Sequence, residues 1–400
     1  LSALQLLPYL EQLQGRKASL YFHIPFCSHK CGYCNLFSLQ TNRTEYIATY
    51  LDTLHRQAQQ LSPLTAGLTF DSFAIGGGTP LLLTVPQLEQ LMATAALFGV
   101  HPSHAFTSVE TSPEYADRPR LNVLKKAGVS RVSIGIQSFQ DEELKAIKRR
   151  PRQNTIYQAL DDIRQMDFPY FNIDLIYGIK GQTVESFLYS LEEALRFQPN
   201  ELFIYPLYVR QGTGITEREP DDVCFRMYRA ACKLLQAKGF LQTSMRRFIH
   251  HPSTDAEVSC GDEVMLSCGS GGRSYLGDLH YATRYTVCQQ CIAREIDEYM
   301  ATTDFTVARN GFILSAKEQQ QRFIIKNLMY YMGIDKAEYT RRFGEPLDRT
   351  PLFRQLAEQY WIEETPERIR LTPEGLGYSD YIGQLFITPE IRQLMETYSY

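Results

Sequence analysis

Residues 21–34 read YFHIPFCSHKCGYC, and this stretch constrains the fold and the chemistry of the chain more tightly than any other. It begins as a β-like run and ends in three cysteines, Cys27, Cys31 and Cys34, with turn-forming residues between them. Three thiolates this close together can wrap one corner of a metal cluster, because soft sulfur ligands select iron-sulfur clusters or zinc. The stretch therefore predicts a metal centre directly after a strand.

Zinc and an iron-sulfur cluster differ in the ligands they need here. A structural zinc site needs a fourth ligand, and the only local candidate, His29, is spaced too closely to two of the cysteines to close a tetrahedron. A [4Fe-4S] cluster held at three irons leaves its fourth iron open to bind another molecule. The spacing favours such a cluster, and an open iron indicates catalysis.

The pattern CxxxCxxC with Tyr33 before the last cysteine resembles the radical S-adenosylmethionine (SAM) superfamily. The preceding Tyr-x-His-Ile-Pro-Phe resembles its oxygen-independent coproporphyrinogen III oxidase-like group. The resemblance implies that the open iron binds SAM and that one-electron reduction gives a 5′-deoxyadenosyl radical. The cofactors carry this chemistry, while the protein places them and excludes side reactions. The partners implied are a small-molecule substrate and a one-electron donor such as flavodoxin or ferredoxin.

The composition of the 400 residues is that of an ordinary globular protein, with 44% apolar and 22% charged residues. The net charge of −4 gives no reason to expect nucleic acid or an acidic membrane surface as a partner. The chain has nine cysteines, no signal-peptide pattern and no apolar run near the roughly 18 residues of a membrane helix. We therefore expect a reduced, cytoplasmic protein with no membrane segment.

Short apolar runs alternate with longer amphipathic ones in the first half of the chain, which is typical of β/α units around a parallel sheet. The fold class expected is α/β, a partial (β/α)6 TIM-type barrel whose active site gathers at the carboxyl ends of its strands. Amphipathic stretches such as Arg43–Leu61 and Val184–Phe197 are expected to form its helices. The six strands expected are residues 20–24, 70–75, 106–110, 131–136, 170–176 and 202–207.

Beyond the barrel the pattern changes twice. A helix and a Cys- and Gly-rich insert, expected as irregular loops at the barrel mouth, precede a segment of helices that ends in a small hairpin. Helices followed by a hairpin predict a winged-helix-like unit, and the resemblance implies an accessory lid. The parts expected are an N-terminal helix (1–15), the radical SAM partial barrel (16–215), the insert (216–303) and the C-terminal accessory domain (304–400).

Three glycines, Gly76–Gly78, end the second expected strand and are followed by Thr79. Glycines let a ligand approach the backbone and can expose successive N–H groups, although a glycine run alone more often marks a turn. The resemblance implies that Gly77, Gly78 and Thr79 flank the methionine part of SAM.

Four further polar side chains follow later strands. Glu110 is a two-oxygen acceptor, Gln137 can both donate and accept, and Asp174 lies near the end of a buried strand, where a charge needs a partner. The resemblance implies that Glu110 and Asp174 lie at the ribose. It also implies that Arg149 holds the SAM carboxylate, a bidentate task that lysine performs poorly. Arg150 is adjacent, so the choice between the two arginines depends on the family's spacing.

Two aromatic residues of the opening stretch, Tyr21 and Tyr33, match aromatic or hydroxyl contacts to SAM in the resembling family. His23 lies between the strand and the cysteines, and the sequence leaves open whether it is a site residue or a satisfied core histidine.

The chain departs from the family at Leu36, where oxidases of this type carry a further cysteine, and at 246–251, where a haem-trafficking branch carries His-Asn-x-x-Tyr-Trp. These departures favour a third branch, the class C methyltransferases. We expect C-methylation of an unsaturated or heteroaromatic small molecule with a second SAM. The glycine and threonine loop at 77–79 and the stretch Gly269–Tyr275 could border that second SAM. The alternatives are an oxidase-like enzyme acting on a tetrapyrrole and a haem-binding chaperone without turnover.

The remaining cysteines leave several hypotheses open. Cys260 and Cys268 flank a loop expected at the barrel mouth and are candidate catalytic thiols, for instance as hydrogen-atom donors. With the CxxC pair Cys288 and Cys291 they could bind a second cluster or zinc. A redox pair or inert buried thiols are equally open. Cys224 and Cys232, at helical spacing, are expected in the core.

Overall fold

The computed structural model describes residues 3–100, 104–150, 152–250, 264–347 and 351–398. The chain divides into two compact units, of which the larger comprises Leu1–Ala231 and Pro252–Ile313 and the smaller Cys232–His251 and Leu314–Ser399. All six expected strands and the three clustered cysteines lie in the larger unit. The four-part division made from the sequence stays a prediction.

The six expected strands form one parallel sheet in the larger unit, and each pairs with the next along the chain. Their carboxyl ends therefore meet at one edge, which is where the polar residues after each strand collect. Since the sheet does not close on itself, the α/β fold with a partial TIM-type barrel is confirmed. The strands are β2 (Lys17–Ile24), β5 (Thr69–Gly77), β6 (Phe106–Thr111), β7 (Arg131–Gln137), β8 (Tyr170–Tyr177) and β9 (Glu201–Pro206).

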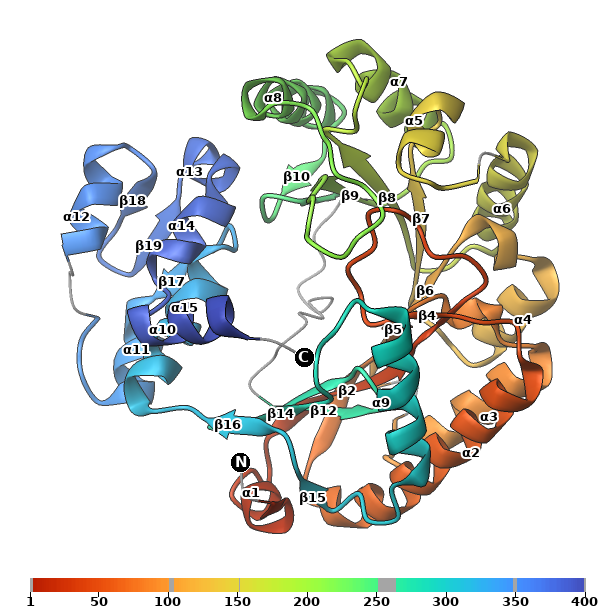
Figure 1. Cartoon of the computed structure of the whole chain (residues 1–400). Helices are drawn as coiled ribbons and strands as arrows, with labels where there is room; N and C mark the ends of the chain where they lie inside the picture. The colour runs from red at the N-terminus through yellow and green to blue at the C-terminus, as the bar shows by residue number, and fades with distance from the viewer. Residues whose placement is uncertain (1–2, 101–103, 151, 251–263, 348–350, 399–400) are drawn as a thin grey trace. The chain divides into compact units, whose positions relative to one another are not determined.

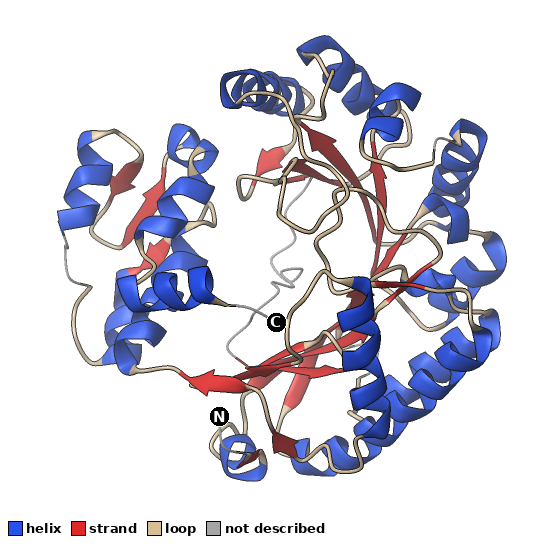
Figure 2. Ribbon diagram, in the orientation of Figure 1, coloured by secondary structure: helices blue, strands red, loops and turns tan. Residues whose placement is uncertain are grey.

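Helices lie between successive strands and cover the outer face of this sheet (Figures 1 and 2). Local sequence explains where several begin: Thr84 and Gln87 form a capping box before α3, and Thr183 with Ser186 forms one before α7. The longest buries a stripe that includes Tyr50, each such apolar side chain contributing about 1.5–3 kcal/mol. The helices are α2 (Thr44–Leu61), α3 (Val85–Ala96), α4 (Arg118–Lys126), α5 (Asp141–Ala146), α6 (Gln153–Met166), α7 (Val184–Leu195) and α8 (Asp221–Ala237).

The insert continues the sheet, and the expectation of irregular loops is wrong for much of it. β12 (Val264–Cys268) pairs in parallel with β2, and all five of its residues are buried. β13 (Arg273–Leu276), β14 (Leu279–Ala282) and β16 (Gly311–Ile313) then add antiparallel strands. The glycines on either side of these strands suggested loops. The strands are short and are stabilised only by pairing with neighbouring strands.

Three short elements and one helix complete the larger unit. β1 (Leu4–Gln5) pairs with β15 (Val307–Ala308) and is followed by α1 (Leu7–Glu11). α9 (Gln289–Ala301) contacts α2, where the Tyr46 hydroxyl donates to Asp297 at 2.7 Å.

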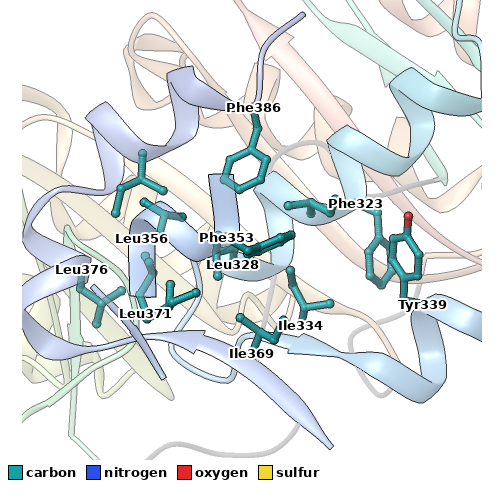
Figure 3. Close-up of a cluster of buried hydrophobic side chains, with 13 residues drawn as sticks. Phe323, Leu328, Ile334, Tyr339, Phe353, Leu356, Ile369, Leu371, Leu376 and Phe386 are labelled. Carbon is teal, nitrogen blue, oxygen red and sulfur yellow. The ribbon is translucent and has the colours of Figure 1, made fainter. Parts of the chain in front are cut away.

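The smaller unit has its own core, which Figure 3 shows around Phe323, Leu328, Leu356 and Phe386. Its three-stranded antiparallel sheet has the order β17-β19-β18, and the hairpin of its last two strands follows helices, as expected for a winged-helix-like unit. The elements are β10 (Leu241–Gln242), β11 (Arg247–Ile249), α10 (Ala316–Leu328), β17 (Ile334–Asp335), α11 (Lys336–Phe343), α12 (Pro351–Glu358), β18 (Ile362–Glu364), β19 (Arg368–Leu371), α13 (Pro373–Gly377), α14 (Ser379–Leu385) and α15 (Pro389–Thr397).

In the described parts of both units, no helix combines the length and the apolar character that crossing a membrane requires.

Candidate active site

The loop that carries the three clustered cysteines is tied at its base. Cys27 ends β3 (Phe26–Cys27), which pairs in parallel with β4 (Leu39–Gln40) beyond the loop. Inside the loop, the Lys30 ammonium group donates to the carbonyl groups of Leu36 and Ser38, each at 3.0 Å. These bonds fix the loop before any metal binds, which lowers the entropy cost of assembling a centre there.

Each of the three thiols has a polar neighbour. The Cys27 sulfur lies 3.6 Å from the Thr79 hydroxyl, and the Arg149 guanidinium lies 3.8 Å from the Cys31 sulfur. The Cys34 sulfur lies 3.8 Å from the Ser38 hydroxyl. Burial raises the pKa of the Cys27 thiol to about 11 and also raises that of Cys31. Buried thiols resist ionisation in the absence of a cation, so a metal that binds here would have to displace the thiol protons.

The donor set fits a [4Fe-4S] cluster better than a single ion. His29 Nε2 donates to the carbonyl group of Lys148 at 2.7 Å, so the candidate fourth ligand of a zinc site is already engaged. Among the residues that the structure describes, no three His, Cys, Asp or Glu side chains are arranged to hold one metal ion. In a [4Fe-4S] cluster the three sulfur atoms need not converge on one ion, because each thiolate binds a different iron. Cys27, Cys31 and Cys34 are the residues that would hold it.

The glycine loop after β5 is joined to the cysteine loop by its backbone. Gly78 N donates to Ile24 O and Thr79 N donates to Phe26 O, each at 2.8 Å, and Gly77 N–H bonds to the Glu110 carboxylate. These N–H groups are therefore bonded within the protein, and the placement of Gly77, Gly78 and Thr79 beside SAM stays a prediction. The glycines are needed for space: a Cβ on Gly76 would lie 2.8 Å from Glu110 Oε2 and 3.0 Å from the Tyr21 hydroxyl.

His23 is a satisfied core histidine and not a free site residue. Its Nε2 donates to the carbonyl group of Phe37 at 2.9 Å, and its Nδ1 accepts from the Tyr21 hydroxyl at 3.1 Å. Burial lowers the pKa of His23 to about 4, so the ring is neutral and can make both bonds. The ring thereby links Tyr21, which keeps accessible surface, to the end of the cysteine loop.

Two predicted residues sit in unusual backbone at the carboxyl end of β7. Gln137 has φ +76°, a left-handed conformation that few non-glycine residues adopt and that is frequent at functional sites. Its amide group lies so close to Gly135 that a Cβ there would be 2.6 Å from the Gln137 Nε2 atom. Arg149 reaches the same place, because its guanidinium donates to the carbonyl group of Gly135 and, at 3.3 Å, to the Tyr33 hydroxyl. Arg150 is exposed, so geometry separates two arginines that the sequence left ambiguous.

The two predicted carboxylates, Glu110 on β6 and Asp174 on β8, both keep accessible surface inside the open barrel. The Asn172 amide donates to the Asp174 carboxylate at 2.7 Å. Desolvation raises the pKa of Asp174 to about 7 and also raises that of Glu110, against the favourable charge of Arg131. Surrounding protein atoms thus make each carboxylate a strong acceptor that a ligand can still reach.

An ion pair beneath these carboxylates was missed in the sequence. Arg131 Nε lies 2.7 Å from Glu201 Oε2, and the two side chains are 13% and 1% exposed. The Arg131 guanidinium also lies 5.4 Å from the ring centroid of Phe203. A signal was present, since Arg131 opens one predicted strand and Glu201 directly precedes another, and a charge at an interior position must be paired. Arg131 supplies the positive charge that opposes protonation of Glu110 and Asp174, whereas the Glu201 carboxylate raises the pKa of Asp174.

Of the two candidate catalytic thiols, Cys268 is buried and Cys260 is not described by the structure. Cys268 is 0% exposed and burial raises the pKa of its thiol, so it lies in the core instead of at an open barrel mouth. The glycine loop after it is also packed: Gly269 N donates to Gln57 Oε1 and Gly271 N to Thr283 Oγ1, each at 2.9 Å. Cys260 lies outside the described residues.

Comparison with known proteins agrees with the two-unit architecture. Residues 21–194 match the model of the radical SAM superfamily, and residues 314–377 match that of the HemN C-terminal domain. In the solved structure of coproporphyrinogen III oxidase (HemN) from Escherichia coli, the same fold covers 96% of this chain and 92% of that one, with a TM-score of 0.82 and 23% identity.

Two curated relatives match nearly the whole chain. The oxygen-independent coproporphyrinogen III oxidase of Salmonella typhimurium is 32% identical over 394 residues, covering 90% of this chain and 83% of that protein. The heme chaperone HemW of Bacillus subtilis is 27% identical over 386 residues, covering 92% of this chain and 100% of that protein. The chain therefore belongs to the radical SAM superfamily and, within it, to the oxygen-independent coproporphyrinogen III oxidase-like group, whose cofactors are a [4Fe-4S] cluster and SAM.

Proposed function

We propose that this protein is a radical SAM enzyme that modifies a tetrapyrrole. The observation that carries the proposal is the arrangement of accessible acceptors, Glu110 and Asp174, at the carboxyl ends of their strands, with Arg149 against the cysteine loop. The relatives that span the chain include an oxidase named for coproporphyrinogen III and a chaperone named for heme, and both names support a tetrapyrrole ligand.

In this proposal the cluster and SAM supply a 5′-deoxyadenosyl radical after one-electron reduction by a donor such as flavodoxin or ferredoxin. Glu110 and Asp174 accept hydrogen bonds from the ribose, and Arg149 binds the SAM carboxylate. The residues that complete the binding surface are Tyr21, Tyr33, Gly77, Gly78, Thr79 and Gln137. The enclosing sheet and helices exclude water from the radical, as such chemistry requires.

A chaperone that binds heme without turnover is the second candidate. The observation that favours it is the match to the Bacillus subtilis heme chaperone over the whole of that protein. Leu36 also favours the chaperone. Its side chain is 51% exposed close to the third cysteine, and it provides no fourth thiol of the kind expected in an oxidase.

C-methylation with a second SAM, the first choice from the sequence, has weaker support. The two relatives described above are an oxidase and a chaperone, and the glycine loop suggested for the second SAM uses two of its N–H groups in internal bonds. Methylation is therefore retained only as an outcome of the experiment below.

Anaerobic incubation of the reconstituted protein with reductant, methyl-deuterated SAM and either coproporphyrinogen III or heme tests the proposal. The expected result is 5′-deoxyadenosine formation that depends on the tetrapyrrole and yields a modified tetrapyrrole. Deuterium retained in methionine indicates oxidation, and deuterium in the product indicates methyl transfer. Stoichiometric heme binding with no tetrapyrrole-dependent SAM cleavage would refute the enzymatic proposal in favour of the chaperone.

A further inference from the structure

A second pair of cysteines lies outside the site described above, at the start of α9. Cys288 is the N-cap residue of this 13-residue helix, and its sulfur accepts a hydrogen bond from the backbone N–H of Cys291 at 3.4 Å. Cys288 is exposed and Cys291 is half-buried, and neither forms a disulfide. The pair is therefore reachable from solvent, unlike the buried thiols of Cys224 and Cys268.

The two thiols differ in acidity for a structural reason. The Cys291 thiol donates a hydrogen bond to the Cys288 sulfur, which lowers the pKa of Cys288 and raises the pKa of Cys291. The backbone N–H of Cys291 and the positive charge of Arg294 also favour a thiolate at Cys288. The Cys288 sulfur is therefore the better nucleophile, and the Cys291 thiol stays protonated. The same difference in acidity is found in the CxxC motifs of thiol–disulfide oxidoreductases.

Residues three apart at the start of a helix lie on one face, close enough for their side chains to meet. The contact between the Cys288 sulfur and the Cys291 backbone already turns the first thiol toward the second residue. A disulfide requires this proximity of neighbouring side chains. A second metal site has less support, because no third His, Cys, Asp or Glu side chain joins the pair within the described ranges.

We propose that Cys288 and Cys291 form a thiol–disulfide exchange site for a low-molecular-weight disulfide. The Cys288 thiolate attacks one sulfur of that disulfide, the sulfur–sulfur bond breaks, and the first half leaves as a thiolate. Cys291 then loses its proton, attacks the Cys288 sulfur and releases the second half as a thiol. The protein pair is oxidised by two electrons to an internal disulfide, and the small disulfide is reduced to two thiols.

The exchange site lies next to the loop that follows the third clustered cysteine. Gln289, between the two thiols, donates through Nε2 to the Ser38 carbonyl group at 2.9 Å and accepts at Oε1 from Gln40 N at 2.8 Å. The Tyr285 hydroxyl donates to the Asn35 carbonyl group at 2.6 Å. Oxidation of Cys288 and Cys291 therefore takes place next to Gln289, the residue whose side chain holds the loop after Cys34. The proposal does not rest on the proposed function.

Redox titration of the reconstituted holoprotein with glutathione and glutathione disulfide, under anaerobic conditions, tests the site. Trypsin cleaves after Arg284 and Arg294, so both thiols fall in one peptide, 285–294. The expected result is a loss of two hydrogen masses from that peptide in a single two-electron transition. Alkylation of Cys288 at neutral pH should also be at least about tenfold faster than that of the half-buried Cys232, since thiolates and not thiols react.

Two matched variants make the proposal falsifiable even if the disulfide is unstable. Cys291→Ser should accumulate a mixed disulfide with glutathione at Cys288, because the resolving thiol is absent. Cys288→Ser should form neither product, and both variants should keep the iron content of the parent protein. The proposal is overturned if peptide 285–294 stays fully reduced across the titration and Cys291→Ser carries no glutathione, or if both variants react alike.

Discussion

The larger unit holds two sets of closely spaced cysteines whose surroundings are opposite. Cys27, Cys31 and Cys34 lie in a tied loop, and burial raises the pKa of the first two. Cys288 and Cys291 begin a helix at the surface, where a hydrogen bond between them lowers the pKa of Cys288. Similar spacing thus supports metal ligation in one place and thiol exchange in the other.

The difference comes from the contacts that each backbone makes. The loop is fixed by Lys30 and by the pairing of β3 with β4. Its thiols lie near Thr79, which follows β5, and near Arg149. At the start of the helix Cys288 and Gln290 are exposed, and the terminal N–H groups favour a thiolate. Spacing alone therefore does not decide thiol chemistry, whereas burial and nearby donors do.

The largest expected effect separates the two sets by iron content. Cys31→Ala should reduce reconstituted iron from about four per chain to background and abolish SAM cleavage, because the cluster loses a ligand. Cys288→Ser, the matched control at the exposed pair, should keep both. Iron analysis and 5′-deoxyadenosine assays measure this, and circular dichroism checks folding. Full SAM cleavage by Cys31→Ala would contradict the assignment of the loop.

The next effect tests the arginine that reaches the cysteine loop. Arg149→Lys should weaken SAM binding about 10- to 100-fold, since a charged hydrogen bond contributes about 1.5–3 kcal/mol and lysine cannot bind a carboxylate with a fork. Arg150→Lys is the adjacent control and should change affinity less than about twofold. The dissociation constant of SAM from each reconstituted variant tests this prediction. Equal losses of SAM affinity in the two variants would show that Arg149 has no special role.

The third prediction uses pH at the deeper part of the site. Because burial raises the pKa of Asp174 to about 7, SAM affinity should fall as pH decreases below 7, by at most about tenfold per unit for one proton. Asp174→Asn should remove this dependence. The effect of pH on folding stability has the opposite direction. The Asp174 carboxyl group makes its full contribution to the free energy of unfolding below its unfolded pKa of about 3.9, and that contribution is lost as pH rises through 7. An unchanged pH profile of SAM affinity in the variant would exclude Asp174 as the titrating group.

The smallest effect concerns the link between the two cysteine sets. Gln289→Ala removes the bonds to Ser38 and Gln40 and should cost about 1–2 kcal/mol of unfolding free energy. It should also hasten loss of iron in air, because the loop after Cys34 is less firmly held. Gln290→Ala, on the same turn, is the control. Identical iron-loss rates in the two variants would show that the sets are structurally independent.

Parts of this molecule could be predicted because their signals are local. The six parallel strands follow from short apolar runs. Helical spacing predicts a helix at 184–197, and the structure has it at Val184–Leu195. β12 and β13 were missed because each is short and bordered by glycines. Strands of that length are stable only beside a partner, and periodicity does not reveal the partner.

The candidate site divides in the same way. The residue types and order of the cysteines, glycines and carboxylates are visible in the sequence, as is the resemblance they support. The ion pair of Arg131 with Glu201 and the engagement of His29 by Lys148 join residues far apart in the chain. Such contacts depend on which strands become neighbours.

The sequence by itself determined that this chain places three thiolate donors after its first barrel strand, and that polar residues end the strands that follow. Only the tertiary structure decided which groups are satisfied: that His23 is neutral and bonded, that Arg149 reaches the cysteines while Arg150 does not, and that Cys268 is buried. The reason is physical, since local pattern specifies strands and turns, whereas burial, charge and hydrogen-bond partners are properties of the packed chain.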